Sequence, residues 1–268
     1  MPDSLTLFRI CEHDELPSTN DAIKQAIDAG APEGEVVCAR VQTAGYGRQG
    51  RAWKSPEGGL YLSVLLRPAV PPAQLPTLSL VVGIAVRRAL AALTGSDAIK
   101  VKWPNDVVLE AAGAGEAPGA APTTAAAVPF WKLCGISSEL HGKAMCVGIG
   151  VNVVAPAELC AVGGKNAAAY AADLAAGPVS IVQVRDAVLG ELARCYERWQ
   201  AGGFAAFAEE YGRCAALTGR QVRVERADGS VIACGTVQGV DEAGALIVQD
   251  EQGCQASVTS GEAHISQL

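Results

Sequence analysis

Residues 42–51 constrain the fold and the function of this chain more than any other segment. They read Gln-Thr-Ala-Gly-Tyr-Gly-Arg-Gln-Gly-Arg and directly follow an apolar stretch, residues 35–41, that is typical of a buried strand. Glycines let backbone N–H groups approach a ligand closely, and arginines supply forked donors that match carboxylate or phosphate. We therefore expect residues 42–51 to form a loop, called the glycine loop below, that holds an anion.

A dinucleotide-binding fingerprint is the first alternative for this loop. Gly45, Gly47 and Gly50 fit the pattern G-x-G-x-x-G, which requires a helix directly after the glycines and an acidic residue about 20 positions later. Pro56 and the paired glycines that follow it interrupt the chain before a helix can begin, and no carboxylate stands near position 70. The context therefore argues against a dinucleotide fold, and an ordinary glycine turn with solvated arginines remains the simpler alternative.

The bulk composition favours one large domain and one small domain. The chain has 268 residues, half of them hydrophobic, and a formal net charge of −7 at pH 7. This acidic balance argues against a general nucleic-acid or membrane-surface binder, so we expect no DNA and no membrane among the partners. The sequence contains no run of 18 or more apolar residues and no secretory signal.

The nine cysteines are scattered along the chain without any C-x-x-C pair. This pattern fits neither a disulfide framework nor a zinc site, so we interpret them as reduced, mostly buried thiols. Reduced thiols predict a cytoplasmic protein, and we expect no metal site built from its side chains alone.

Hydrophobic periodicity predicts an α+β fold, a mixed β-sheet flanked by helices, within a large domain over residues 1–217. We expect strands over residues 35–41, 60–66, 99–103, 107–109, 130–140 and 145–151, and helices over residues 22–29, 75–93, 181–199 and 204–217. Residues 110–129 are low in complexity, which predicts a flexible surface insertion within a hairpin. Short alternating strands beyond Gly219 predict a small C-terminal β-barrel over residues 218–268.

Further segments place chemistry-bearing residues around the glycine loop. Residues 18–20 read Ser-Thr-Asn, residues 100–106 read Lys-Val-Lys-Trp-Pro-Asn-Asp, residues 132–139 read Lys-Leu-Cys-Gly-Ile-Ser-Ser-Glu, and residues 148–152 read Gly-Ile-Gly-Val-Asn. Each has a simpler interpretation, as a helix cap, a hairpin turn or solvated charges on a strand. In this order, and together with the glycine loop, they make residues 7–268 resemble the biotin protein ligases.

The resemblance implies a class II synthetase-like biotin ligase catalytic domain and a reaction in two steps. Biotin and ATP form biotinyl-5′-AMP and pyrophosphate, and a lysine amine of the biotin carboxyl carrier protein then attacks the mixed anhydride. The carrier belongs to acetyl-CoA carboxylase or another biotin-dependent carboxylase. Because a carboxylate must meet a polyphosphate, the site needs cations between them, and the resemblance implies Mg²⁺ beside basic side chains.

The resemblance also assigns roles residue by residue. Arg48 and Lys132 would flank the biotin carboxylate and the α-phosphate, Lys102 would steady the phosphate charge, and Asp106 would orient the incoming lysine and help remove its proton. The other implied ligand contacts are Ser18, Thr19, Asn20 and Gln42 near the ureido head, Gly135 and Gly148 beside the bicyclic ring, Trp53 over the acyl chain, Asn105 and Asn152 at the nucleotide, and Gly45, Tyr46, Gly47 and Arg51 in the glycine loop.

Three residues depart from the family pattern. Tyr46 stands where an arginine is common, so one cation is lost, although a tyrosine can supply a hydroxyl or a stacking face. Ser137 and Ser138 stand where apolar residues are usual, which alters the pocket wall. We expect the C-terminal module to present the carrier or to close over ATP.

Two other functions stay open at this point. A lipoyl or octanoyl ligase or transferase shares the catalytic fold, but those families usually show a triple glycine with a nearby histidine, and this chain has only paired glycines. A non-catalytic sensor of biotin or its adenylate is the other alternative. Because only 17 residues precede Ser18, we expect a ligase without a DNA-reading domain. We also expect a monomer or a weak homodimer.

Overall fold

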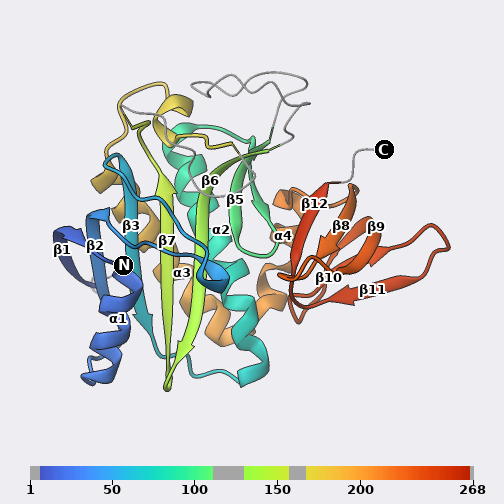
Figure 1. The fold of residues 1–268 in the computed structure, drawn as a ribbon, viewed down its shortest axis with the longest axis horizontal. Helices are drawn as coiled ribbons and strands as arrows, with labels where there is room; N and C mark the ends of the chain where they lie inside the picture. Colours follow the sequence, from blue (N-terminus) through green and yellow to red (C-terminus); the bar gives the residue numbers. More distant parts are fainter. Residues whose placement is uncertain (1–6, 111–129, 157–166, 266–268) are drawn as a thin grey trace.

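The computed structural model describes residues 7–110, 130–156 and 167–265, and it arranges them in two β-sheets with flanking helices (Figure 1). The insertion expected over residues 110–129 lies, apart from Glu110, outside the described residues. The first sheet has seven strands in the order β1-β2-β3-β7-β6-β5-β4, and the second has five strands in the order β11-β10-β9-β8-β12.

The strands of the first sheet are β1 (Arg9–Leu16), β2 (Glu35–Gln42), β3 (Gly59–Leu66), β4 (Ile99–Lys102), β5 (Asp106–Glu110), β6 (Phe130–His141) and β7 (Ala144–Asn152). Those of the second sheet are β8 (Gln221–Glu225), β9 (Val231–Val240), β10 (Leu246–Gln249), β11 (Gln255–Val258) and β12 (Glu262–Ile265). The helices are α1 (Thr19–Asp28), α2 (Leu78–Thr94), α3 (Ile181–Gly202) and α4 (Ala208–Cys214), with short 3₁₀ turns η2 (Arg48–Gly50), η3 (Pro72–Thr77), η4 (Ala171–Leu174) and η5 (Phe204–Phe207).

The first sheet is mixed because β1 pairs with β2 in parallel, whereas its other neighbouring strands pair antiparallel. The expectation of a mixed sheet flanked by helices is confirmed. The sequence did not predict β1, whose residues are almost all exposed because the strand lies at the edge of the sheet. The helix expected over 75–93 begins only at Leu78, because residues Pro72–Thr77 form a 3₁₀ turn instead of the start of the α-helix.

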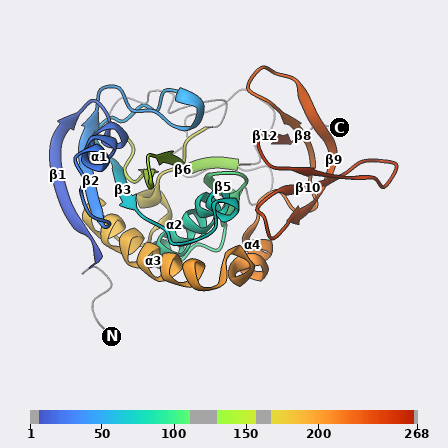
Figure 2. The same ribbon diagram turned by 90° about the horizontal axis from the view of Figure 1, so that it is seen from below.

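The two faces of the first sheet carry different cores. On one face α2 and α3 lie together and enclose the larger core, as Figure 2 shows. On the other face α1 packs Ile23 and Ile27 against Val37, Leu65 and Cys146. Alternate residues of one strand therefore enter different cores, as the two-residue repeat of a strand requires.

The alternation of side chains along β7 forms part of a cavity. Val147, Ile149 and Val151 enter the larger core, so Gly148 and Gly150 point to the face that carries α1. The first turn of α1 and these glycines border the same hollow. The part of the sheet that α1 leaves uncovered becomes the floor of a cavity.

The second sheet is open, although a closed barrel was expected. Its order leaves β11 and β12 at opposite edges of the described sheet, and β10, β11 and β12 have four residues each. Barrel closure would require a pairing that joins the two edges, and the described strands β11 and β12 do not pair with each other. The structure therefore has a small five-stranded antiparallel sheet at its C-terminal end.

Hydrogen bonds hold the second sheet against the β4–β5 end of the first. The indole Nε1 of Trp103 donates to the Gly244 carbonyl at 3.0 Å, and Arg220 Nη2 donates to Glu110 Oε1 at 2.5 Å. Trp103 is 2% exposed, so its indole N–H needs this protein acceptor. The second sheet is thereby fixed at one end of the cavity.

Helix α2 is apolar because it belongs to the core. The segment Pro72–Thr94 has a mean hydropathy of 1.5 and is long enough to cross a membrane, but 61% of that apolar stretch is buried inside the fold. Its apolar side chains pack against the sheet and α3, which accounts for its composition.

We predict that Trp103→Phe loosens the second sheet without unfolding the first. The phenyl ring keeps most of the packing but leaves the Gly244 carbonyl without its donor, at a cost of about 1 kcal/mol. Hydrogen exchange of the backbone amides in β10 and in residues 241–245 should become faster, whereas exchange in β3 and β7 should not change. Equal exchange of β10 in both proteins would contradict the proposed docking role.

Candidate functional site

A cavity of about 520 Å³ lies over the uncovered part of the first sheet and extends to the second sheet. The glycine loop, the first turn of α1, the β4–β5 turn, and strands β6 and β7 line it from the first sheet's side. The predicted site residues in its lining are Thr19, Asn20, Gln42, Tyr46, Gly47, Arg48, Arg51, Trp53, Lys102, Asn105, Asp106, Lys132, Gly135 and Gly148. Most of the residues selected from the sequence are therefore brought together in one place.

Three predicted site residues lie outside this lining and support it instead. Ser18 is the N-cap of α1, and its Oγ accepts from the Asp21 amide at 3.4 Å. The Gly45 carbonyl accepts from the Trp53 amide at 2.8 Å. Asn152 Nδ2 donates to the Lys132 carbonyl at 2.9 Å, which ties β7 to the backbone of a lining lysine.

Cationic side chains gather at the turn between β4 and β5. Lys132 Nζ forms an ion pair with Asp106 Oδ1 at 2.9 Å, and Arg48 Nη1 donates to Asn105 Oδ1 at 3.1 Å. Lys102 lies directly across the β4–β5 ladder from Asp106. Asp106 is thus the carboxylate at the centre of three cations.

Burial makes this charge cluster costly. Burial lowers the pKa of the Lys102 ammonium, and the nearby Asp106 offsets that effect only in part. Burial also lowers the pKa of the Arg48 guanidinium. Burial therefore disfavours the charged forms of both groups, so a bound anion would stabilise those charged forms.

The Asn105 side chain holds the turn against β6. Its Nδ2 donates to the Ile136 carbonyl at 2.7 Å. The backbone carbonyl of Asn105 accepts from the Ile136 amide at 2.9 Å. Because Asn105 Oδ1 also receives Arg48, the amide links the glycine loop, the turn and β6. This arrangement places Arg48 over the same part of the cavity as Lys132.

The opposite part of the cavity, near α1, has a wall of hydrogen-bonded polar groups. Gln42 Oε1 accepts from the Thr19 amide at 2.8 Å and lies 3.1 Å from Thr19 Oγ1, while Gln42 Nε2 donates to Ser55 Oγ at 2.8 Å. Ser63 Oγ lies 2.8 Å from Thr19 Oγ1 and 2.6 Å from Asn20 Oδ1. These bonds fix the orientation of the two amides, so this wall presents defined donors and acceptors. We call it the polar wall.

The glycines of β6 and β7 make room for protein side chains. A Cβ at Gly148 would lie 2.3 Å from Asn20 Oδ1, and one at Gly150 would lie 2.8 Å from Trp53 Nε1. A Cβ at Gly135 would lie 3.0 Å from the Trp53 ring. Gly135 and Gly148 were expected to leave room for a ligand ring, whereas in the structure Trp53 and Asn20 occupy the space beside them.

Trp53 lies flat on this glycine floor and faces the cation cluster. Lys132 Nζ lies 5.1 Å from its ring centroid, within the range of a cation–π contact. The indole Nε1 is buried and has no hydrogen-bond partner among the described residues. Trp53 therefore presents both an apolar face and a donor to whatever occupies the cavity.

The second sheet contributes lining residues that the sequence did not predict. Glu225, Arg226, Gly229, Glu262 and His264 line the far side of the cavity. Arg51 of the glycine loop forms an ion pair with Glu262 of β12. Charged residues on or beside short antiparallel strands give no sequence signal for a site. Only the fold shows that these residues line the cavity.

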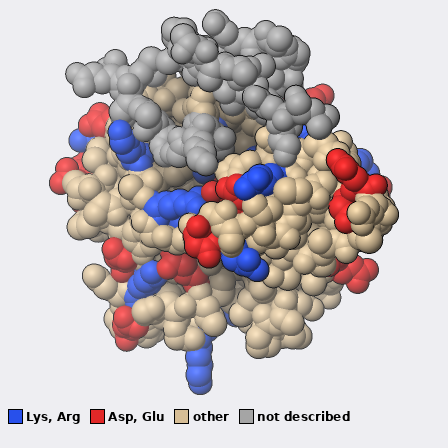
Figure 3. All heavy atoms as spheres, turned by 45° about the vertical axis from the view of Figure 1, so that its right-hand side comes forward, with Lys and Arg blue, Asp and Glu red and all other residues tan. Residues whose placement is uncertain are grey.

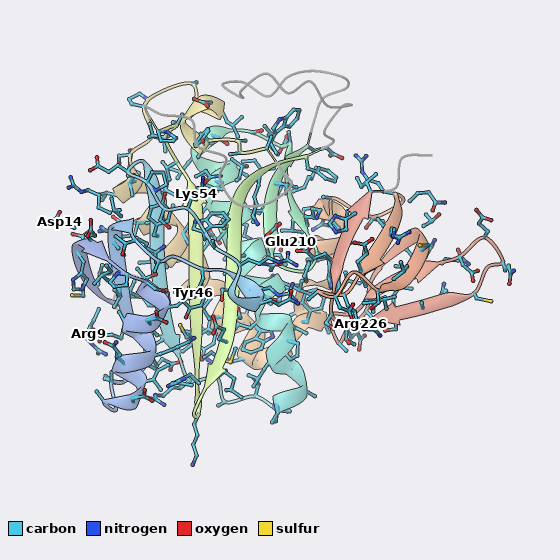
Figure 4. The ribbon with its side chains drawn as sticks, viewed as in Figure 1. Arg9, Asp14, Tyr46, Lys54, Glu210 and Arg226 are labelled. Carbon is cyan, nitrogen blue, oxygen red and sulfur yellow. The ribbon has the colours of Figure 1, made fainter. Side chains whose placement is uncertain are left out.

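The figures show how the charges lie around this cavity. Tyr46 lies over the first sheet and Arg226 lies in the second (Figure 4). On the face shown in Figure 3, basic and acidic side chains lie side by side across the middle of the molecule. In the described part of the chain, no group of three or more His, Cys, Asp or Glu side chains is placed to hold a metal ion.

Comparison with known proteins identifies the family. Residues 14–152 match the family model described as Biotin/lipoate A/B protein ligase family, and residues 217–265 match that of the Biotin protein ligase C terminal domain. The chain belongs to the Biotin/lipoate A/B protein ligase family. The resemblance found in the sequence is therefore confirmed.

Relatives and solved structures agree with this assignment. The chain is 32% identical over 255 residues to the biotin–acetyl-CoA-carboxylase ligase of Paracoccus denitrificans, covering 89% of this chain and 93% of that protein. It is 27% identical over 252 residues to the bifunctional ligase/repressor BirA of Bacillus subtilis, covering 90% of this chain and 69% of that protein. The biotin protein ligase from Aquifex aeolicus in complex with biotin and ATP superposes with a TM-score of 0.77 at 26% identity, covering 97% of this chain and 99% of that one.

We predict that Lys102→Met stabilises the ligand-free protein on the order of 1 kcal/mol, because it removes a buried charge from the cluster. The pKa of Lys102 is lower in the folded state than its ordinary value of 10.5. At a pH between the folded pKa and 10.5, folding therefore releases a proton. The free energy of unfolding of the wild type should rise with pH in that window, relative to the variant.

The matched control for this prediction is Lys100→Met, which changes a lysine of the same strand that does not line the cavity. Urea denaturation at neutral pH and near pH 10 measures both variants. A Lys102→Met protein that is less stable than the wild type at neutral pH would show that the lysine stabilises the empty fold.

Proposed function

We propose that this protein is an ATP-dependent biotin protein ligase, which forms biotinyl-5′-AMP and transfers biotin to a lysine of the biotin carboxyl carrier protein of acetyl-CoA carboxylase. One observation carries the proposal: a single cavity joins a polar wall to a cluster of partly desolvated cations. A neutral polar ring and an anionic phosphate are the ligands that these two ends suit. The similar Aquifex aeolicus protein was solved with biotin and ATP.

The polar wall favours biotin over lipoate. Thr19, Asn20, Gln42 and Ser63 offer hydroxyls and amides whose orientation is fixed by their mutual hydrogen bonds. The cyclic urea of biotin has two N–H donors and a carbonyl acceptor to pair with them, whereas the dithiolane ring of lipoate has none. An apolar ring would leave unpaired those N–H groups and lone pairs of the wall that these mutual hydrogen bonds do not use, at about 1–3 kcal/mol each.

The cation cluster suits the first step. A carboxylate oxygen of biotin attacks the α-phosphorus of ATP, the bond to the bridging oxygen breaks, and pyrophosphate leaves. Arg48 and Lys132 flank the two anions, and Lys102 stabilises the charge that develops on the phosphate oxygens. Arg48 is already directed by Asn105, and Lys132 by Asp106, so little reorganisation is needed when the ligands bind.

Mg²⁺ fits this site as a companion of the phosphates. Mg²⁺ is usually held by substrate phosphates and one or two carboxylates, and it retains several waters. Asp106 supplies a carboxylate at the cation cluster, and the described residues offer no separate cluster for a resident metal. When bound, Mg²⁺ would supply further neutralisation of the polyphosphate charge.

Asp106 suits the second step. Its Oδ1 is buried and, apart from the ion pair with Lys132, accepts no well-directed hydrogen bond from the described residues. The incoming lysine must lose a proton, and Asp106 accepts it while the nitrogen attacks the acyl carbon. The bond between the acyl carbon and the phosphate oxygen then breaks, giving the amide and AMP.

The second sheet closes the nucleotide end of the cavity in this proposal. Its support is the ion pair between Arg51 and Glu262 and the position of Arg226 in the lining. We place the reaction in the cytoplasm, because cysteines such as Cys38, Cys134 and Cys195 are free and buried. We propose a monomer or weak homodimer that binds no DNA.

The direct test is transfer of biotin to an apo carrier domain in the presence of ATP and Mg²⁺. The wild type should label the carrier lysine with biotin and not with lipoate or octanoate. Lys132→Ala should lower the rate of adenylate formation about 100-fold or more while biotin binding, measured by calorimetry, is retained.

Lys143→Ala is the control, because Lys143 lies exposed in the turn between β6 and β7. Labelling with lipoate in place of biotin would favour the lipoyl ligase alternative. Biotin binding without any labelling of the carrier would favour a sensor.

A further inference from the structure

Tyr46, the unusual residue of the glycine loop, is bonded to α1. Its hydroxyl donates to Asp21 Oδ1 at 2.7 Å and accepts from Lys24 Nζ at 2.9 Å. Lys24 Nζ also lies 5.3 Å from the centroid of the Tyr46 ring. Tyr46, which stands where an arginine is common, is thus contacted by the ammonium of Lys24 on α1.

Lys24 connects Tyr46 to a second unusual position, Ser137. Lys24 Nζ forms an ion pair with Glu139 Oε2 at 2.6 Å, and Glu139 Oε1 accepts from Ser137 Oγ at 2.9 Å. Asn20 Nδ2 donates to the same carboxylate oxygen at 3.5 Å. The Lys24–Glu139 ion pair therefore contacts Tyr46 of the glycine loop and two further cavity residues, Asn20 and Ser137.

The ion pair itself stands behind the cavity. Tyr46, Ser137 and Asn20 line the cavity, whereas Lys24 and Glu139 do not. The side chains of Lys24 and Glu139 are 23% and 34% exposed, so water screens the pair only in part. This pair acts on any ligand through the three lining side chains, without touching it.

The pKa shifts of Lys24 and Tyr46 both favour the protonated forms that the hydrogen bonds of this network require. Burial by itself would lower the pKa of Lys24, but its hydrogen bonds to Glu139 and Tyr46 outweigh that effect and raise it. Burial raises the pKa of Tyr46, so the phenol keeps its proton for Asp21. Ser137 gives its own proton to Glu139, which leaves its oxygen lone pairs available on the cavity side.

We propose that Lys24 and Glu139 are positioning residues for biotin, which fasten the glycine loop to the polar wall before the ligand binds. In this arrangement Ser137 accepts an N–H of the cyclic urea, and Tyr46 holds the loop over the ring. The inference rests on the proposed function for the identity of the ligand. The contacts themselves join two of the three residues at which this chain departs from the family pattern, Tyr46 and Ser137.

The test compares Lys24→Met, Glu139→Gln and the milder Tyr46→Phe with the wild type. Each should raise the KM for biotin and the dissociation constant for biotin, measured by calorimetry without ATP, about 5- to 30-fold, which corresponds to 1–2 kcal/mol. The release of biotinyl-5′-AMP should accelerate by a similar factor. The KM for ATP and kcat should change less than twofold, because the cation cluster is untouched.

The exposed Lys143→Met variant is the matched control and should leave all these values unchanged. The double variant Lys24→Met/Glu139→Gln should weaken biotin binding by less than the product of the two single effects, since both single changes break the same ion pair. Unchanged biotin affinity in all three single variants would overturn the proposal. A loss spread equally over biotin, ATP and kcat, with a lowered melting temperature, would also overturn it, since that pattern marks a merely structural pair.

Calorimetry separates this inference from the proposed function. If the wild type fails to label a carrier but binds biotin, and the three variants weaken that binding, the positioning role stands and the ligase proposal fails. If the wild type labels the carrier and the variants bind biotin as tightly as the wild type does, the ligase proposal stands and the positioning role fails.

Discussion

Crowding of like charges in a partly buried site is the constraint on which the rest of this structure depends. Arg48, Lys102 and Lys132 converge on one carboxylate, Asp106, and burial lowers the pKa of both Arg48 and Lys102. We expect such a cluster to destabilise the empty protein, because Asp106 offsets the cost only in part and an entering anion would offset more of it. The β4–β5 hairpin, its Asn105 contacts to β6 and the ordering of the glycine loop can each be understood as means of holding these cations together.

The sheet provides the rest of the site through its two-residue repeat. One set of β7 side chains fills the core under α2 and α3, which leaves the opposite set free to be glycine. Those glycines admit Asn20 and Trp53 onto the sheet, so a polar wall and an aromatic floor stand beside the charge cluster. The Lys24–Glu139 pair then ties the wall to the loop, and the second sheet closes the far end. Recognition of a neutral ring and of an anion is thereby divided between two ends of one cavity.

The sequence predicted the mixed sheet, and most of the site residues that it predicted line the cavity, because both leave local signals. Buried strands read as apolar runs, and the Lys-Trp-Pro-Asn-Asp turn and the glycine loop carry their chemistry in consecutive residues. Edge strand β1 has no buried face and therefore no pattern to detect. Ser63 and Gly150 look like ordinary strand residues, and Lys24 looks like a solvated helix residue. Their roles arise from contacts with Asn20, Trp53 and Glu139, which are distant in sequence. The assignment of Ser18 shows the converse limit, because Ser18 caps α1 and does not line the cavity.

The most direct test of the central claim is the thermal stabilisation of the protein by two analogues of biotinyl-5′-AMP. One analogue keeps the phosphate in a non-hydrolysable form, and the other replaces it by an uncharged linker of the same length. If the crowded cations are built for an anion, the charged analogue should raise Tm well above the uncharged one in the wild type, and Lys102→Met should lose most of that difference. Equal stabilisation by both analogues would contradict this claim, because it would show that the charge cluster does not serve ligand binding.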